Sequence, residues 1–129
     1  MKHATDLTEA EWALMEQLWS FPGATGRFLT EALQKNTGWS RSTTLTLLRR
    51  LTEKGAVRAE EQDGVHAYFP ALSREDAAVS QTRDLLSRVY HGSLSLLVSA
   101  MTRKEALSKA EIDELHAILD EMEAKQGDA

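Results

Sequence analysis

Residues 40–54 combine hydroxyl and guanidinium side chains at a spacing that suits contact with a nucleic acid. Read as a helix, the run SRSTTLTLLRRLTEK places Leu47, Leu48 and Leu51 on one face, towards a protein interior. The opposite face carries Ser42, Thr43, Thr46, Arg49, Arg50 and Glu53. Hydroxyl and guanidinium groups hydrogen-bond to base edges and phosphates, and threonine methyls can touch thymine methyls. The pattern therefore predicts a helix that enters a DNA groove; a solvated polar helix face is the alternative.

The charge of this segment supports the same interpretation, although the chain as a whole is acidic. The 129 residues carry a net charge of −5. Within residues 40–58, one acid, Glu53, stands among five cations, which makes a local net charge of +4. The five cations of this basic stripe are Arg41, Arg49, Arg50, Lys54 and Arg58. Because phosphate attraction depends on the local field, the stripe can bind DNA, and Arg41 joins the expected contact residues.

The remaining reactive side chains form no pattern that predicts catalysis or metal binding. The four histidines, His3, His66, His91 and His116, never occur at the i, i+4 spacing of a helical zinc site, and the chain has no cysteine. The glycines form no phosphate-binding loop, and no serine lies in a nucleophile-elbow sequence. We therefore expect a protein that is not an enzyme and that holds neither a metal nor a cofactor.

Three helices must position the polar face, and local signals mark where each begins and ends. The expected N-terminal caps are Thr8, with Glu11 completing a capping box, Thr25 and Ser40. The expected ends are the turn residues 21–23, the segment 36–38 and Gly55. Because the third helix starts at Ser40, the sequence predicts that it runs to about Lys54 and carries the whole polar face.

Two short strands follow the third helix and form a β-hairpin in this prediction. Val57–Glu61 and Val65–Phe69 are strand-like and are separated by a turn that contains Asp63 and Gly64. Three helices and a hairpin are the order of a winged helix-turn-helix. Arg58 and His66 are the wing residues expected to reach DNA, and a hairpin that only covers the core is the alternative for each.

The C-terminal half is expected to be helical and to form a dimer. One helix starts at Ser73 and ends near Gly92, a short apolar helix spans residues 93–101, and a third begins at Ser108. Residues 125–129 are expected to lack regular structure. The expected dimer-interface residues are Leu94, Leu97, Met101, Ile112, Leu115, Leu119 and Met122. The predicted fold is therefore mainly α with a small β-hairpin: a winged-helix DNA-binding domain over residues 1–72 and a helical dimerisation domain over residues 73–129.

Several long runs of this chain resemble one family of regulators. The runs LTEAEWALMEQLW, TGWSRSTTLTLLRRLTEKGAV, YFPALSRED, HGSLSLLVSAM and LSKAEIDELHAIL, within about residues 7–122, are similar to the penicillinase-repressor (BlaI/MecI/CopY) family. The resemblance implies a winged-helix repressor that binds a pseudo-palindromic operator as a homodimer. Thr43, Thr46 and Arg50 match the family's recognition-helix pattern, whereas Arg41, Ser42 and Arg49 occupy variable positions.

The resemblance also implies a route of induction. In the β-lactam branch, a membrane sensor with a metalloprotease domain leads to cleavage in the dimerisation region, and the equivalent bond here is Ala100–Met101. The family's cleaved pair is Asn-Phe, whereas this chain has Ala-Met. The copper branch senses metal through Cys-x-Cys pairs, and this chain has no cysteine. The further partners that the resemblance implies are a membrane sensor protease or its downstream protease.

Together these patterns predict a cytoplasmic, homodimeric transcriptional repressor whose partner is double-stranded operator DNA. The absence of cysteine fits a reducing compartment, no apolar run approaches the roughly 20 residues that span a bilayer, and residues 1–12 lack the apolar stretch of a signal peptide. The alternative is a winged-helix module that uses its third helix against a protein and does not bind DNA. Salt-dependent DNA affinity would separate the two.

Overall fold

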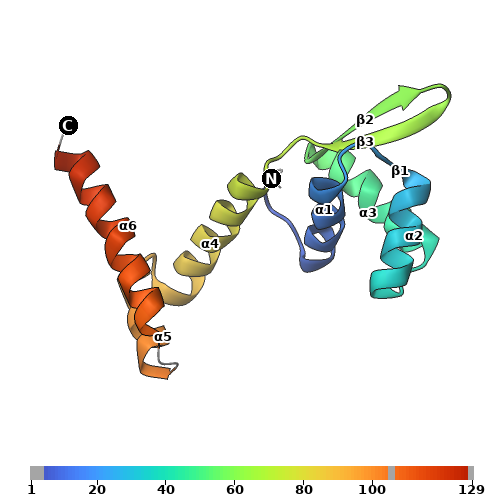
Figure 1. Cartoon of the computed structure of the whole chain (residues 1–129). Helices are drawn as coiled ribbons and strands as arrows, with labels where there is room; N and C mark the ends of the chain where they lie inside the picture. The colour runs from blue at the N-terminus through green and yellow to red at the C-terminus, as the bar shows by residue number, and fades with distance from the viewer. Residues whose placement is uncertain (1–4, 105–106, 128–129) are drawn as a thin grey trace. The chain divides into compact units, whose positions relative to one another are not determined.

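The computed structural model describes residues 5–104 and 107–127 of the chain (Figure 1). Its elements are α1 (Glu9–Ser20), β1 (Ala24–Thr25), α2 (Gly26–Thr37), α3 (Arg41–Lys54), β2 (Val57–Gln62), β3 (Val65–Pro70), α4 (Arg74–Tyr90), α5 (Leu94–Lys104) and α6 (Lys109–Gly127). The chain forms two compact units, the first ending at Asp84 and the second beginning at Leu85. The functional division expected at residues 72 and 73 falls just before α4, whose first turns belong to the first unit.

The first three helices, α1, α2 and α3, begin at the caps that the sequence predicts. The Thr8 side chain accepts a hydrogen bond from the Glu11 backbone and the Glu11 side chain accepts one from the Thr8 backbone, so the capping box is complete. Thr25 and Ser40 cap α2 and α3 by accepting the backbone N–H groups of Phe28 and Thr43, without a reciprocal side chain. Gly55 ends α3 at a φ of 86°, a left-handed conformation that glycine adopts without steric cost.

The wing is a tight hairpin of β2 and β3, extended by a strand that the sequence analysis missed. Asp63 and Gly64 both have positive φ, 52° and 79°, as a two-residue type I′ turn requires. The third strand, β1, pairs antiparallel with β3, so the sheet order is β1-β3-β2. A strand of two residues has no periodicity to read, and only pairing with β3 defines it.

The core of the first unit lies between α1, α2, α3 and the sheet. Its largest fully buried side chains come from all three helices: Leu14, Met15, Leu18, Leu29, Leu33, Leu51 and Thr44. Leu47 and Leu48 are buried beside them, as expected. These residues follow the three- and four-residue spacing of amphipathic helices, so burying them fixes which face of α3 points outward.

The second unit has a different character, because in its described residues no side chain of α5 or α6 is buried. Ser93 caps α5 through the Leu96 backbone N–H, and Ser108 caps α6 through that of Glu111. The expectation that residues 125–129 lack regular structure is wrong in part, because α6 continues to Gly127. The sequence around Lys125 contains no helix breaker before Gly127, so the last turn continues.

Candidate nucleic-acid interface

The first turn of α3 gathers a cluster of hydroxyl groups. The Ser40 Oγ lies 3.2 Å from the Ser42 Oγ and 3.0 Å from the Thr43 Oγ1, and it accepts the Thr43 backbone N–H. These contacts form because Ser40 is the N-cap of α3, which places its side chain beside the residues of the first helical turn. The cluster therefore presents oriented hydroxyls at the helix N-terminus, where the helix dipole also favours anions such as phosphate.

The outward face of α3 carries the expected contact residues. Thr46 is half-buried, whereas the other five, Arg41, Ser42, Thr43, Arg49 and Arg50, are exposed. Leu45 is 37% exposed on the same surface. Because Leu47, Leu48 and Leu51 anchor the opposite face in the core, the polar face is held in a fixed orientation and remains accessible.

Two grooves flank α3 and divide the expected contact residues other than Arg41 between them. The groove towards α1, of about 340 Å³, is lined by Ala10, Trp39, Ser42, Thr43, Thr46, Leu47 and Arg50. The groove towards the wing, of about 320 Å³, is lined by Leu45, Leu48, Arg49, Thr52, Glu53, Ala59, His66 and Tyr68. The structure thus brings Thr43, Thr46 and Arg50 together on one side, and Arg49 beside the wing residue His66 on the other.

Arg58, the other expected wing residue, lies against the surface of the sheet. Its Nε is 3.1 Å from a Glu60 carboxylate oxygen, and its guanidinium lies 5.0 Å from the centre of the Phe69 ring. Both members of the ion pair are about half exposed, so the pair is weak and can exchange for another anion. Arg58 does not line the groove that contains His66.

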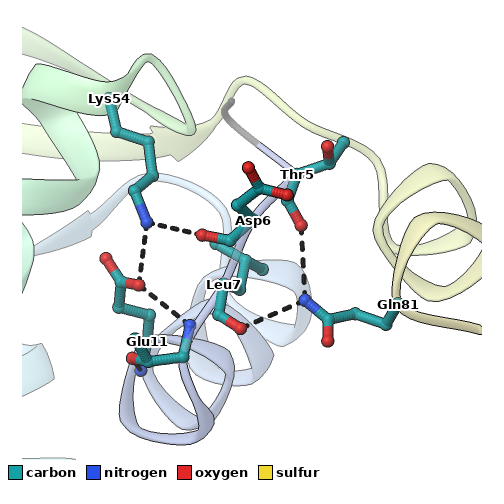
Figure 2. A network of polar contacts seen from close by, with 7 residues as sticks. Thr5, Asp6, Leu7, Glu11, Lys54 and Gln81 are labelled. Carbon is teal, nitrogen blue, oxygen red and sulfur yellow. Dashed lines mark hydrogen bonds and ion pairs between the residues drawn. The ribbon is translucent and has the colours of Figure 1, made fainter. Parts of the chain in front are cut away.

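Lys54 does not belong to the basic stripe on the surface, contrary to the sequence analysis. Its Nζ lies 2.8 Å from the Glu11 Oε1 and 2.6 Å from the Asp6 carbonyl oxygen (Figure 2). The Lys54 and Glu11 side chains are 7% and 4% exposed. From the sequence, Glu11 is recognisable only as a capping residue. Its partner Lys54 is 43 positions away, so only the fold shows that the two residues pair.

Glu11 remains charged in this buried setting because its partners outweigh the cost of burial. Burial by itself raises the pKa of Glu11, but hydrogen bonds from Lys54 and Thr8, together with the charge of Lys54, bring the pKa below its ordinary value of 4.5. The pair therefore ties the end of α3 to the start of α1 and holds the outward face of α3 in place.

Trp39 is a candidate contact residue that the sequence analysis missed. It is half-buried, packs against the core and lines the groove that contains Thr43 and Arg50. The indole N–H groups of Trp12 and Trp19 donate to Glu16 and to the Leu72 carbonyl, whereas within residues 5–104 and 107–127 that of Trp39 has no partner. The sequence signal that could have identified it is its position directly before Ser40, the N-cap of α3, which places the ring beside the first turn of that helix.

Comparison with known proteins identifies the family. The family model of the penicillinase repressor matches residues 7–121. The chain belongs to the penicillinase repressor family. It is 31% identical over 121 residues to the penicillinase repressor of Bacillus licheniformis, covering 94% of each chain. It is 30% identical over 114 residues to the methicillin resistance regulatory protein MecI of Staphylococcus aureus, covering 88% of this chain and 93% of MecI.

Solved structures of this penicillinase repressor family confirm the predicted winged-helix fold. The DNA-binding domain of the repressor BlaI superposes with a TM-score of 0.53 at 29% identity, over 59% of this chain and 93% of that domain. The monomeric form of Bacillus licheniformis BlaI, solved in complex with the blaP half-operator, superposes with a TM-score of 0.52 over the same shares. The relatives are repressors, so the prediction of a regulator that is not an enzyme is confirmed.

The side chains expected at a repressor dimer interface lie on α5 and α6. Leu97 is half-buried, and the other six, Leu94, Met101, Ile112, Leu115, Leu119 and Met122, are between 39% and 60% exposed. The bond expected to be cleaved, Ala100–Met101, lies within α5.

Among the described residues, no group of histidine and acidic side chains is arranged to hold a metal ion. None of the described helices combines the length and the apolar character that a membrane span requires.

Proposed function

We propose that this penicillinase repressor family member represses transcription by placing α3 in the major groove of double-stranded operator DNA. The observation that carries the proposal is the two-sided character of α3. Its leucines are buried in the core, while its hydroxyl and guanidinium side chains face two open grooves. The relative BlaI binds a half-operator in its monomeric form, so a single winged-helix unit of this size suffices for one half-site.

The two grooves suggest separate roles for the contact residues. Thr43, Thr46 and Arg50 share the groove towards α1, where they can approach base edges and one phosphate strand. Arg49 and His66 lie across the second groove, where the wing can meet the other strand. Arg41 and Ser42 extend the first set at the N-terminus of α3, and Arg58 reaches phosphate by leaving Glu60.

We propose that the repressor acts as a homodimer through the second unit. Its apolar side chains have no core of their own in the described residues, and burial of each leucine-sized side chain contributes roughly 1.5–3 kcal/mol. A second copy offers the same apolar surface in return, as a two-fold interface requires. Two recognition helices about 34 Å apart would then read a pseudo-palindromic operator. The dimer would act in the cytoplasm, where the operator is.

We propose that induction follows the family's β-lactam branch, as a cut at Ala100–Met101 by a membrane sensor protease or its downstream protease. The bond lies in α5, so this helix must open locally before a protease can bind it in an extended form. The cut would separate Leu94 and Leu97 from the apolar face of α6 and leave monomers that bind half-sites. Mass spectrometry of the chain from induced cells tests this: a fragment ending at Ala100 supports it, and an intact chain during full derepression refutes it.

The DNA-binding assignment is tested with Arg50→Ala and the matched control Lys125→Ala, which removes the same charge from α6. Fluorescence anisotropy is measured on a duplex that the full chain selects from a random library, at several salt concentrations. If Arg50 contacts a base, Arg50→Ala should weaken binding by about 1–3 kcal/mol; if it contacts a phosphate, the same change should lower the slope of log affinity against log salt by about one. Lys125→Ala should change neither the affinity nor the slope. If wild type shows no salt-dependent affinity, the alternative of a winged-helix protein-interaction module holds instead.

A further inference from the structure

Residues 5–7, which precede α1, are held from two sides by elements far away in the sequence. The Gln81 side-chain amide of α4 donates to the carbonyl oxygens of Thr5 and Leu7, at 3.3 and 3.1 Å. The Lys54 ammonium of α3 donates to the carbonyl oxygen of Asp6, which lies between them. Figure 2 shows the two donors on opposite sides of this segment, which we call the N-terminal strap.

The N-terminal strap therefore joins the recognition helix to α4 through a continuous chain of polar contacts. Lys54, the last residue of α3, also pairs with Glu11, whose carboxylate accepts the Thr8 backbone N–H at the start of α1. Leu7 is buried in the core, so the strap cannot slide along the surface. A displacement of α4 at Gln81 would have to break these bonds or carry the strap with it.

Gln81 is well placed to set the direction of α4. At the base of this helix, the Arg74 guanidinium lies 3.0 Å from Glu16 and over the Trp12 ring, and Ala77 is fully buried. Positions 74, 77 and 81 follow the helical spacing i, i+3, i+7 and share one face. Arg74 and Gln81 are about 10 Å apart along the helix axis, at 1.5 Å per residue. A helix attached at two such points has a defined direction, whereas a helix attached at one point can change its direction.

We propose that Gln81 is a positioning residue that fixes the direction of the first turns of α4, residues 74–84, relative to α3, and thereby influences the half-site spacing that the dimer accepts on DNA. This rests on the proposed dimeric repressor, since α4 runs on from the winged-helix unit to Tyr90 in the second unit. Simultaneous binding of two half-sites gains from tethering only when the geometry of the two modules matches the sites. Losing the strap bonds should therefore affect binding of two half-sites and spare binding of one.

The test compares wild type, Gln81→Leu and Gln34→Leu, the last being the same change at an exposed glutamine of α2. Each protein is titrated onto the selected duplex, onto the same duplex with one half-site scrambled, and onto duplexes with one base pair inserted or removed between half-sites. Gln81→Leu should bind the single half-site as wild type does. It should bind the full site roughly fivefold to 150-fold more weakly, the range that corresponds to two lost hydrogen bonds, and should discriminate less between spacings.

A second measurement keeps the proposal open to refutation if Gln81→Leu is poorly folded. The chain has no cysteine, so spin labels at Lys35→Cys and Arg83→Cys, two exposed positions of the first unit, report the direction of the first turns of α4 without background labelling. The distance distribution should broaden in Gln81→Glu, whose carboxylate cannot donate to the strap carbonyls. Unchanged spacing discrimination, an equal loss on single half-sites, or an unchanged distance distribution would overturn the proposal. Failure of wild type to bind any duplex would instead overturn the proposed function.

Discussion

The buried pair of Glu11 and Lys54 leads to a sharp prediction for Glu11→Gln. Glutamine is isosteric and keeps an oxygen that can accept from Lys54 and from the Thr8 backbone, so the change removes charge while preserving shape and capping. Lys54 is then left with an uncompensated ammonium that is 7% exposed. Loss of one partner from a buried ion pair costs roughly 3–5 kcal/mol, and the retained hydrogen bonds place this variant at the lower end, about 3 kcal/mol.

A matched control is available in the same unit. Glu16 pairs with Arg74 at 3.0 Å, but the two side chains are 39% and 58% exposed. Glu16→Gln should therefore cost less than about 1 kcal/mol, because solvent screens the charge. Thermal unfolding followed by circular dichroism should show Glu11→Gln melting about 12–24 °C below wild type, at roughly 4–8 °C per kcal/mol for a unit of this size, and Glu16→Gln melting close to wild type.

The pH dependence gives an independent check with a defined sign. The pKa of Glu11 is below its ordinary value of 4.5 in the folded state, so the unfolded chain takes up a proton first as the pH falls. The stability from the pair is therefore complete above about pH 4.5 and is lost as the pH falls through the folded pKa. The gap between wild type and Glu11→Gln should narrow below pH 4.5. Equal melting temperatures at pH 7, or a gap that does not narrow as the pH falls below 4.5, would refute the reasoning.

Three further predictions concern the recognition helix, the groove and the second unit. Thr44 is fully buried in α3, and its Oγ1 has no partner in the described part of the chain. Thr44→Val should therefore raise the free energy of unfolding by about 1 kcal/mol in urea denaturation, and a lowered urea midpoint would contradict this. The Trp39 indole N–H, which has no partner among the described residues, is expected to donate to a DNA phosphate, so Trp39→Phe should weaken duplex binding by about tenfold. Trp12→Phe should leave binding unchanged in the same anisotropy titration, because the Trp12 indole already donates to Glu16. Leu119→Asp should make the chain monomeric in sedimentation equilibrium and retain single half-site affinity; a persistent dimer would exclude this position from the interface.

Elements defined by short-range interactions were predictable from the sequence. Each helix of the first unit starts where a hydroxyl side chain meets a backbone N–H three residues on, so Thr8, Thr25 and Ser40 could be recognised without any tertiary contact. The hairpin follows equally locally from Asp63 and Gly64, which accept positive φ. The polar face of α3 was predictable because helical periodicity alone separates its leucines from its hydroxyls.

The sequence by itself thus determined the elements, the outward residues of α3 and the family resemblance, because each is written in neighbouring residues or in long co-linear runs. Only the tertiary structure decided which cations stay on the surface. Periodicity cannot tell a solvated lysine from Lys54, whose partner Glu11 is 43 positions away. The same holds for β1, which exists only by pairing with β3, and for Gln81, which holds a strap 74 residues distant. Burial removes water from such groups, so the distant partner that replaces water determines their role.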